Sequence, residues 1–149
     1  MKLARNKIDI KKISSSEDLK FFHRLRNSHD YLKEVKQRKK KFSIFKKNFL
    51  IIGKNQIVYI IFYKKLRAGI FYINKKKYWG IIISKKFRKR RIATYVIKKA
   101  LKKHKNLKTL TNISNYFIII ILFKLGFKPI ILKNKTQIMW KSNKKLKVL

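Results

Sequence analysis

The sequence contains no cysteine, one proline and only four glycines among its 149 residues. The absence of cysteine excludes a disulfide scaffold, a cysteine-ligated zinc site and a thiol nucleophile. Three histidines and five acidic side chains are too few for us to expect a metal centre built by protein ligands. The longest uncharged apolar run, residues 116–123, is far shorter than the roughly 20 residues that cross a bilayer. We therefore expect no membrane span, no metal and a cytoplasmic protein.

The acidic residues are also confined to one part of the chain. They are Asp9, Glu17, Asp18, Asp30 and Glu34, and no carboxylate side chain follows Glu34. This distribution excludes any mechanism that takes a carboxylate base from the rest of the chain.

Positive charge dominates the composition, because 43 lysines and arginines against five acidic residues give a formal net charge of +38. Such a field attracts polyanions, which include nucleic acid, acidic membranes and phosphorylated cofactors. An AT-rich genome would produce the same excess of lysine, isoleucine and asparagine in any protein, although it does not explain the shortage of acids. Charge alone therefore names no function.

A hydrophobic fraction of 46% is enough to build a real core. Without a Pro/Gly/Ser-rich linker, we expect one domain over residues 1–141 and a short basic tail over 142–149. In the first half, Ser14 and Glu17 fit a capping box for a helix that runs to about Arg26, and a second helix is expected within 30–48. Strands of an antiparallel meander are expected at 7–13, 49–52, 56–63, 66–73 and 78–84.

The second half alternates helices and strands. Apolar residues at a 3.6-residue period predict a helix from Ile92, and a strand is expected over 107–113. Ser114 or Asn115 can cap the next helix, which Gly126 should end, and a hairpin over 128–140 follows. These elements predict an α/β protein with a mixed, mostly antiparallel sheet flanked by helices, in which 78–113 form a right-handed parallel crossover.

The most informative segment joins an apolar strand to a helix. The basic loop 85–91 follows Ser84 and leads directly into the helix that starts near Ile92. A loop before a helix N-terminus gathers unpaired backbone N–H groups, which suit a phosphate or diphosphate. No Gly-Lys-Ser/Thr occurs, so the segment is not a P-loop. The alternative is a solvated basic turn in a lysine-rich protein.

Two motifs in this region resemble the GCN5-related N-acetyltransferase family. The segment 87–93 takes the place of the family's aromatic followed by Arg/Gln-x-x-Gly-x-Gly/Ala, and Asn115 precedes a helix that ends in Leu-Gly-Phe at 125–127. The resemblance covers residues 8–140 and implies a β-α-β unit that binds acetyl-CoA. The cofactor-binding residues that it implies are Ile83, Ser84, Phe87, Arg88, Lys89, Arg90, Arg91, Ile92, Ala93, Thr94 and Asn115.

The sequence also departs from the family. The family's motif glycines are replaced by Lys89 and Arg91, its late-helix tyrosine by Leu122, and the nearest match to its strand glutamate is Gly80. Both usual proton-transfer groups are therefore missing. Tyr116 is a candidate donor for the leaving thiolate, with a core aromatic as the alternative.

The remaining candidates for acid–base work lie mostly near the first helix. His23, His29, Asp30 and Glu34 are candidate bases, whereas His104 is expected to be an exposed histidine at a helix end.

The resemblance implies an enzyme that moves an acetyl group from acetyl-CoA to a primary amine, on an amino-sugar nucleotide or a protein, by direct attack. The alternative is a catalytically weak or dead module that binds nucleic acid through its charge. A basic membrane-surface protein is disfavoured, because the apolar face of the helix over 92–103 is needed by the sheet.

Overall fold

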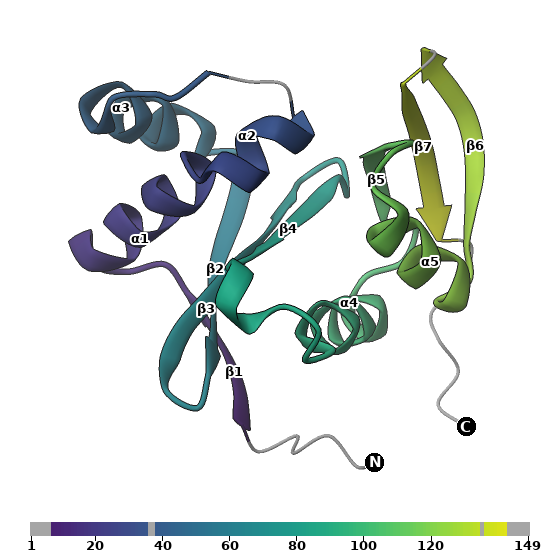
Figure 1. The fold of residues 1–149 in the computed structure, drawn as a ribbon, viewed down its shortest axis with the longest axis horizontal. Helices are drawn as coiled ribbons and strands as arrows, with labels where there is room; N and C mark the ends of the chain where they lie inside the picture. The colour runs from purple at the N-terminus through teal and green to yellow at the C-terminus, as the bar shows by residue number, and fades with distance from the viewer. Residues whose placement is uncertain (1–6, 36–37, 135, 143–149) are drawn as a thin grey trace. The chain divides into compact units, whose positions relative to one another are not determined.

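The computed structural model describes residues 7–35, 38–134 and 136–142. Contacts divide the chain into two compact units. Figure 1 shows the helices and strands of the chain. The first comprises Met1–Lys75 and Gly80–Ile92, and the second Lys76–Trp79 and Ala93–Leu149. One domain over 1–141 stays a prediction. Of the expected tail, Ser142 lies in the last strand and 143–149 lie outside the described residues.

The first unit is built on a four-stranded sheet in the order β1-β2-β3-β4. β1 pairs antiparallel with β2, and β2 with β3, so the predicted meander is confirmed for these strands. The strands are β1 (Ile8–Lys12), β2 (Gln56–Tyr63), β3 (Leu66–Asn74) and β4 (Trp79–Ile83).

In the sequence, three helices of the described residues separate β1 from β2: α1 (Ser16–Arg26), α2 (His29–Val35) and α3 (Phe42–Ile52). The strand expected over 49–52 is wrong, because these residues are the last turn of α3. Phe45 and Phe49 recur at helical spacing, and their ring centroids lie 5.1 and 6.1 Å from that of Phe22 on α1. A short apolar run cannot by itself distinguish a strand from a buried helix segment. Phe22 and Phe45 belong to the core that covers the sheet.

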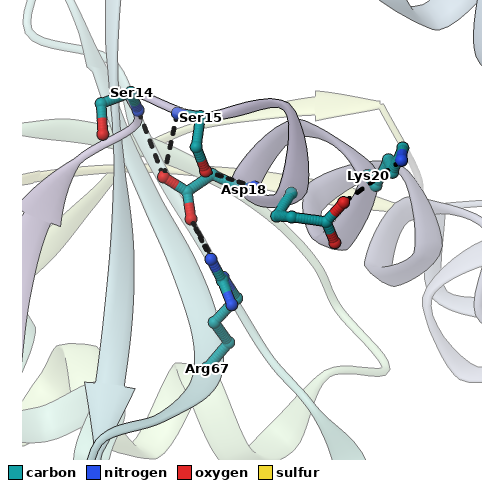
Figure 2. Close-up of polar contacts among 6 residues, drawn as sticks. Ser14, Ser15, Asp18, Lys20 and Arg67 are labelled. Carbon is teal, nitrogen blue, oxygen red and sulfur yellow. Dashed lines mark hydrogen bonds and ion pairs between the residues drawn. The ribbon is translucent and has the colours of Figure 1, made fainter.

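A carboxylate links the start of α1 to β3 (Figure 2). Asp18 accepts hydrogen bonds from the backbone N–H groups of Ser14 and Ser15 at 3.2 and 3.3 Å, and the Ser15 hydroxyl accepts from the Asp18 N–H at 3.1 Å. Arg67 donates to the same carboxylate through Nε and Nη2, both at 2.9 Å. The capping box is therefore Ser15–Asp18 and the predicted Ser14–Glu17 pair is wrong by one residue, because Asp18 turns back to the N–H groups that precede the helix whereas Glu17 pairs with Lys20 at the surface.

The second unit contains a three-stranded antiparallel sheet in the order β5-β7-β6. Its elements are α4 (Ile92–Lys103), whose first residue belongs to the first unit, β5 (Lys108–Asn112), α5 (Tyr116–Lys124), β6 (Phe127–Asn134) and β7 (Gln137–Ser142).

Local signals in the second unit match the prediction. Gly126 has a φ of +80° after α5, as a left-handed helix end requires. Tyr78 forms an isolated parallel bridge with Lys108, the strand direction that the predicted crossover needs. The buried Trp140 indole donates to the Thr111 hydroxyl at 2.7 Å. Every helix among the described residues is too short or too polar to cross a membrane.

We predict that Asp18→Ala lowers the free energy of unfolding by about 2–3 kcal/mol, because it removes a helix cap and leaves Arg67 without its partner. Glu17→Ala is the matched control. It removes the same charge from the neighbouring residue, which forms only an exposed ion pair with Lys20. Its effect on the free energy of unfolding should therefore stay within about 0.5 kcal/mol. Urea unfolding of both variants measures the difference, and equal losses would contradict the role of Asp18.

The contribution of Asp18 should also depend on pH. Burial raises the pKa of its carboxyl group, but the Ser14 N–H, Arg67 and Ser15 outweigh burial and hold it below the ordinary value of 3.8. The stabilisation is therefore complete above pH 3.8 and is lost as the pH falls through the pKa of the folded state. Urea unfolding across this range should show the wild type and Asp18→Ala converging in acid.

Candidate functional site

The basic loop is anchored to the sheet at its start. The Ser84 N–H donates to the Ala68 carbonyl at 2.8 Å, and a short 3-10 turn, η2 (Lys85–Phe87), follows. Phe87 is buried, and its ring meets the edge of the Tyr63 ring with centroids 6.1 Å apart. The aromatic residue of the predicted motif is thus the anchor that holds the loop against β2.

Two arginines of the loop have defined partners. Arg88 donates from Nε to the Ile83 carbonyl at 3.1 Å, and its Nη1 lies 3.5 Å from Asp30 Oδ2. The guanidinium of Arg90 lies over the Tyr63 ring, 5.6 Å from its centroid. Partly exposed ion pairs such as Arg88–Asp30 contribute little stability, so a phosphate can replace this carboxylate.

The loop has a left-handed backbone at the two places where the family has glycine. Lys89 has a φ of 61° and Arg91 a φ of 57°, and both residues are exposed. A left-handed conformation costs a residue with a Cβ about 1–2 kcal/mol. The side chains therefore extend outward and leave the backbone of the loop accessible.

The backbone of the loop offers hydrogen-bond donors. Among the hydrogen bonds between described residues, the N–H groups of Lys89, Arg90 and Arg91 donate to no acceptor. Successive amides in left-handed and turn conformations form concave sites for anions, and exposed cations beside them strengthen the attraction. The residues present therefore fit a phosphate or diphosphate.

A cavity of about 330 Å³ adjoins the loop within the first unit. Asp30 lines it together with Arg88, so the ion pair lies at its wall. The remaining lining residues are Leu25, Ser28, Ile83, Ser84 and Lys85. The cavity is partly apolar and contains one carboxylate among its described lining residues, which suits a small group with an amine.

Ala93, Thr94, Asn115 and Tyr116 lie in the second unit, and their roles toward a cofactor stay predictions. Asn115 caps α5, because its Oδ1 accepts from the Ile118 N–H at 3.5 Å. Tyr116 is 70% exposed, so the alternative that it is a core aromatic is wrong.

Of the other candidate bases, His23 is the one whose side chain the structure describes, and it does not line the cavity. His23 Nε2 lies 2.6 Å from the Lys40 carbonyl oxygen, and its ring packs against Phe42, so its contacts are those of a structural residue. The side chains of His29 and Glu34 lie outside the described residues.

His104 differs from the expected exposed histidine. It is half-buried at the end of α4, where burial lowers the pKa of its imidazole and the charges of Lys77 and Lys103 lower it further. It is therefore poorly suited to carry a positive charge.

Sequence reasoning missed Tyr72, a residue of β3. A Cβ atom on Gly80 would lie 2.3 Å from the Tyr72 hydroxyl oxygen, so this phenol fills the place that best matches the family's glutamate. Burial raises the pKa of the Tyr72 hydroxyl, as does Tyr31, and the opposing effect of Arg26 is smaller. The phenol therefore stays protonated at neutral pH and can donate a hydrogen bond but cannot act as a base.

A glycine inside a predicted strand often marks a place where another part of the protein comes close to the strand. Gly80 was therefore the one sequence feature that could have indicated a neighbouring side chain such as that of Tyr72. The other replaced position, Leu122, is fully buried and offers no proton donor. No group of three potential metal ligands occurs among the described residues.

Several solved structures superpose on most of the chain. A domain from Methanocaldococcus jannaschii has a TM-score of 0.82 at 18% identity, covering 92% of this chain and 98% of its own. Spermidine N-acetyltransferase from Vibrio cholerae, in complex with CoA and spermine, has a TM-score of 0.75 at 12% identity, covering 92% and 94%. A probable acetyltransferase has a TM-score of 0.73 at 13% identity, covering 96% of each chain. No protein-family model and no curated protein matches the sequence.

The chain has the acetyltransferase fold. This confirms the predicted α/β class, with its antiparallel sheet and flanking helices, and the resemblance to the GCN5-related N-acetyltransferases at the level of the fold. At identities of 12–18%, the similarity establishes the fold alone, and the site residues stay predictions.

We predict that Lys89→Gly and Arg91→Gly each raise the free energy of unfolding by about 1 kcal/mol relative to alanine at the same place, because glycine removes left-handed strain. The alanine variants remove the same charge but keep the strain. Arg90, whose φ is not positive, is the control, because glycine there should be less stable than alanine. Thermal unfolding of the six variants tests this, and no glycine advantage at 89 and 91 would contradict the loop conformation.

Proposed function

We propose that the protein transfers an acetyl group from acetyl-CoA to a primary amine. The observation that carries the proposal is the loop 84–91, in which two left-handed residues, donor amides and exposed arginines lie beside a cavity that reaches Asp30. The fold supports it, because the Vibrio cholerae enzyme with this fold binds CoA and spermine.

The loop would hold the coenzyme through its phosphates. The amides of Lys89, Arg90 and Arg91 donate to the diphosphate, and Arg88 exchanges Asp30 for a phosphate oxygen. The resemblance assigns Ile83 and Ser84 to the same site, together with Phe87, Ile92, Ala93, Thr94 and Asn115. When bound, acetyl-CoA supplies the activated thioester, and the chain's own residues position the amine against it.

The reaction itself needs little from the protein beyond positioning. The amine nitrogen would bond to the acetyl carbon and lose a proton to Asp30 or to water, the carbon–sulfur bond would break, and the thiolate would take up a proton. Tyr116 is our candidate donor of that proton. Asp30 is the one carboxylate among the described residues that line the cavity, and once Arg88 has moved to the phosphate it is our candidate base for the amine.

The charge of the chain selects among acceptor amines. A net charge of +38 repels a free polycationic amine, whereas it attracts an amine that is attached to an anionic group. We therefore favour a nucleotide-linked amino sugar, or an amine of an acidic protein, over a free polyamine as the acceptor.

We predict that acetyl-CoA binds the wild type measurably and that Arg88→Gln weakens binding about tenfold, because a charged hydrogen-bond donor to phosphate is lost. Arg91→Glu should weaken it further. Lys98→Gln, on the exposed face of α4, removes the same charge as Arg88→Gln and should leave the affinity nearly unchanged. Isothermal titration calorimetry measures all four proteins.

The outcomes of that titration are separable. No heat and no thermal shift with the wild type at millimolar acetyl-CoA would reject the enzyme. Binding that is unchanged in both arginine variants would place the phosphates elsewhere while leaving the enzyme proposal intact.

A second prediction concerns the acceptor. At low ionic strength, a nucleotide-linked amino sugar should give a higher kcat/KM than spermidine, and added salt should shrink this advantage by screening the field. Release of free CoA thiol, followed for each amine, measures the rates. A preference for spermidine that persists at low salt would contradict the electrostatic selection.

A further inference from the structure

A second basic groove lies along β1 beside Phe62, whose ring also lies 5.7 Å from the Arg67 guanidinium. Its volume is about 560 Å³, and four lysines line it: Lys7, Lys11, Lys64 and Lys65. Lys64 donates its N–H to the Lys7 carbonyl at 2.7 Å, which joins the β2–β3 turn to the start of β1. The lysines therefore come from two segments that the sheet holds together.

The groove has little negative charge of its own. Asp9 is its one acidic residue among those described, and its Oδ2 lies 3.3 Å from Lys11 Nζ, with both side chains largely exposed. Phe62 forms an apolar wall, with Lys11 Nζ 5.7 Å from its ring centroid. Three ammonium groups are left without a carboxylate partner among the described residues.

The turn at the groove has an unfavourable sequence for its shape. Lys64 and Lys65 are the two loop residues between paired Tyr63 and Leu66, and their φ values are 48° and 67°. Positive φ at both positions is the pattern of a type I′ turn, which strongly favours Asn-Gly. Strained backbone of this kind clusters at ligand sites, and here it places two cations at the rim of the groove.

The groove is distinct from the loop proposed for the coenzyme. Tyr63 contacts Phe87 and Arg90 of that loop, whereas its neighbour Phe62 packs against the core beneath α1. Successive residues of a strand point to opposite faces of the sheet. Phe62 and its side of the groove therefore lie on the other face from the loop, whereas Lys64 in the turn places its Nζ over the Tyr63 ring, 5.8 Å from the centroid.

We propose that this groove binds a small oligophosphate. Triphosphate carries about four negative charges at neutral pH, whereas the lining carries four lysines and one aspartate, and the volume lies in the range of small-ligand sites, roughly 300–1,000 Å³. A free triphosphate and the triphosphate of a nucleotide share this chemistry. The Phe62 wall is the feature that a nucleotide would use and a free triphosphate would not.

The test compares two variants that remove equal charge. Lys64→Asn/Lys65→Gly takes two ammonium groups from the groove and installs the favoured turn, and Lys98→Gln/Lys99→Gln takes two from exposed positions of α4. Calorimetry with ATP and with inorganic triphosphate, in saturating CoA to occupy the loop, should show about a tenfold loss of affinity only in the groove variant. The same variant should melt at a higher temperature than the wild type, because its turn is relaxed.

Each outcome decides the proposal. A loss confined to the groove variant supports it, and the tighter of the two ligands identifies the source of the phosphates. Equal losses in both variants, or none in either, overturn it as non-specific attraction. Tighter groove-dependent binding of a single-stranded oligonucleotide than of triphosphate also overturns it, in favour of a nucleic-acid surface. Unchanged CoA affinity in the groove variant separates this result from the proposed enzyme.

Discussion

The ion pair between Asp18 and Arg67 fixes the strand on which the loop depends. Arg67 is followed in β3 by Ala68, whose carbonyl accepts the Ser84 N–H at the start of the loop. One short segment of β3 thus links the cap of α1 to the point where the chain leaves β4. Pairing between β2 and β3 shifts by one residue beside Arg67, so this side chain also marks the point where the register changes.

The sequence predicts those elements whose signals are local. The strands of the meander and the Gly126 helix end follow from periodicity and turn chemistry, and the structure confirms them. The errors come from contacts between distant residues. The capping box at Ser15 includes Asp18, which binds Arg67 far along the chain, and the segment 49–52 is a helix turn in which Phe49 packs against Phe22. The place of Tyr72 over Gly80 depends on strand pairing, which no local pattern specifies.

The scarcity of acids makes anion binding a matter of backbone geometry. Each acidic side chain that the structure describes is already paired with a cation, so surplus cations must be neutralised by anions from solution. Positive charge is present almost everywhere and cannot by itself define a site. The loop 85–91 and the β2–β3 turn each place two cations on left-handed backbone beside a cavity. The pairs are Asp9–Lys11, Glu17–Lys20, Asp18–Arg67 and Asp30–Arg88.

The same positive field would also affect the protonation of an acceptor amine in the proposed reaction. A like charge nearby disfavours the charged form of an ammonium group, so in the proposed reaction the field would lower the pKa of an amine that enters the cavity. An amine that arrives on an anionic carrier is attracted as a whole while its nitrogen is pushed toward the neutral form. In the proposed reaction, charge would thus favour the neutral amine that a glutamate base provides in the GCN5-related N-acetyltransferases, and Gly80 would then be compatible with turnover.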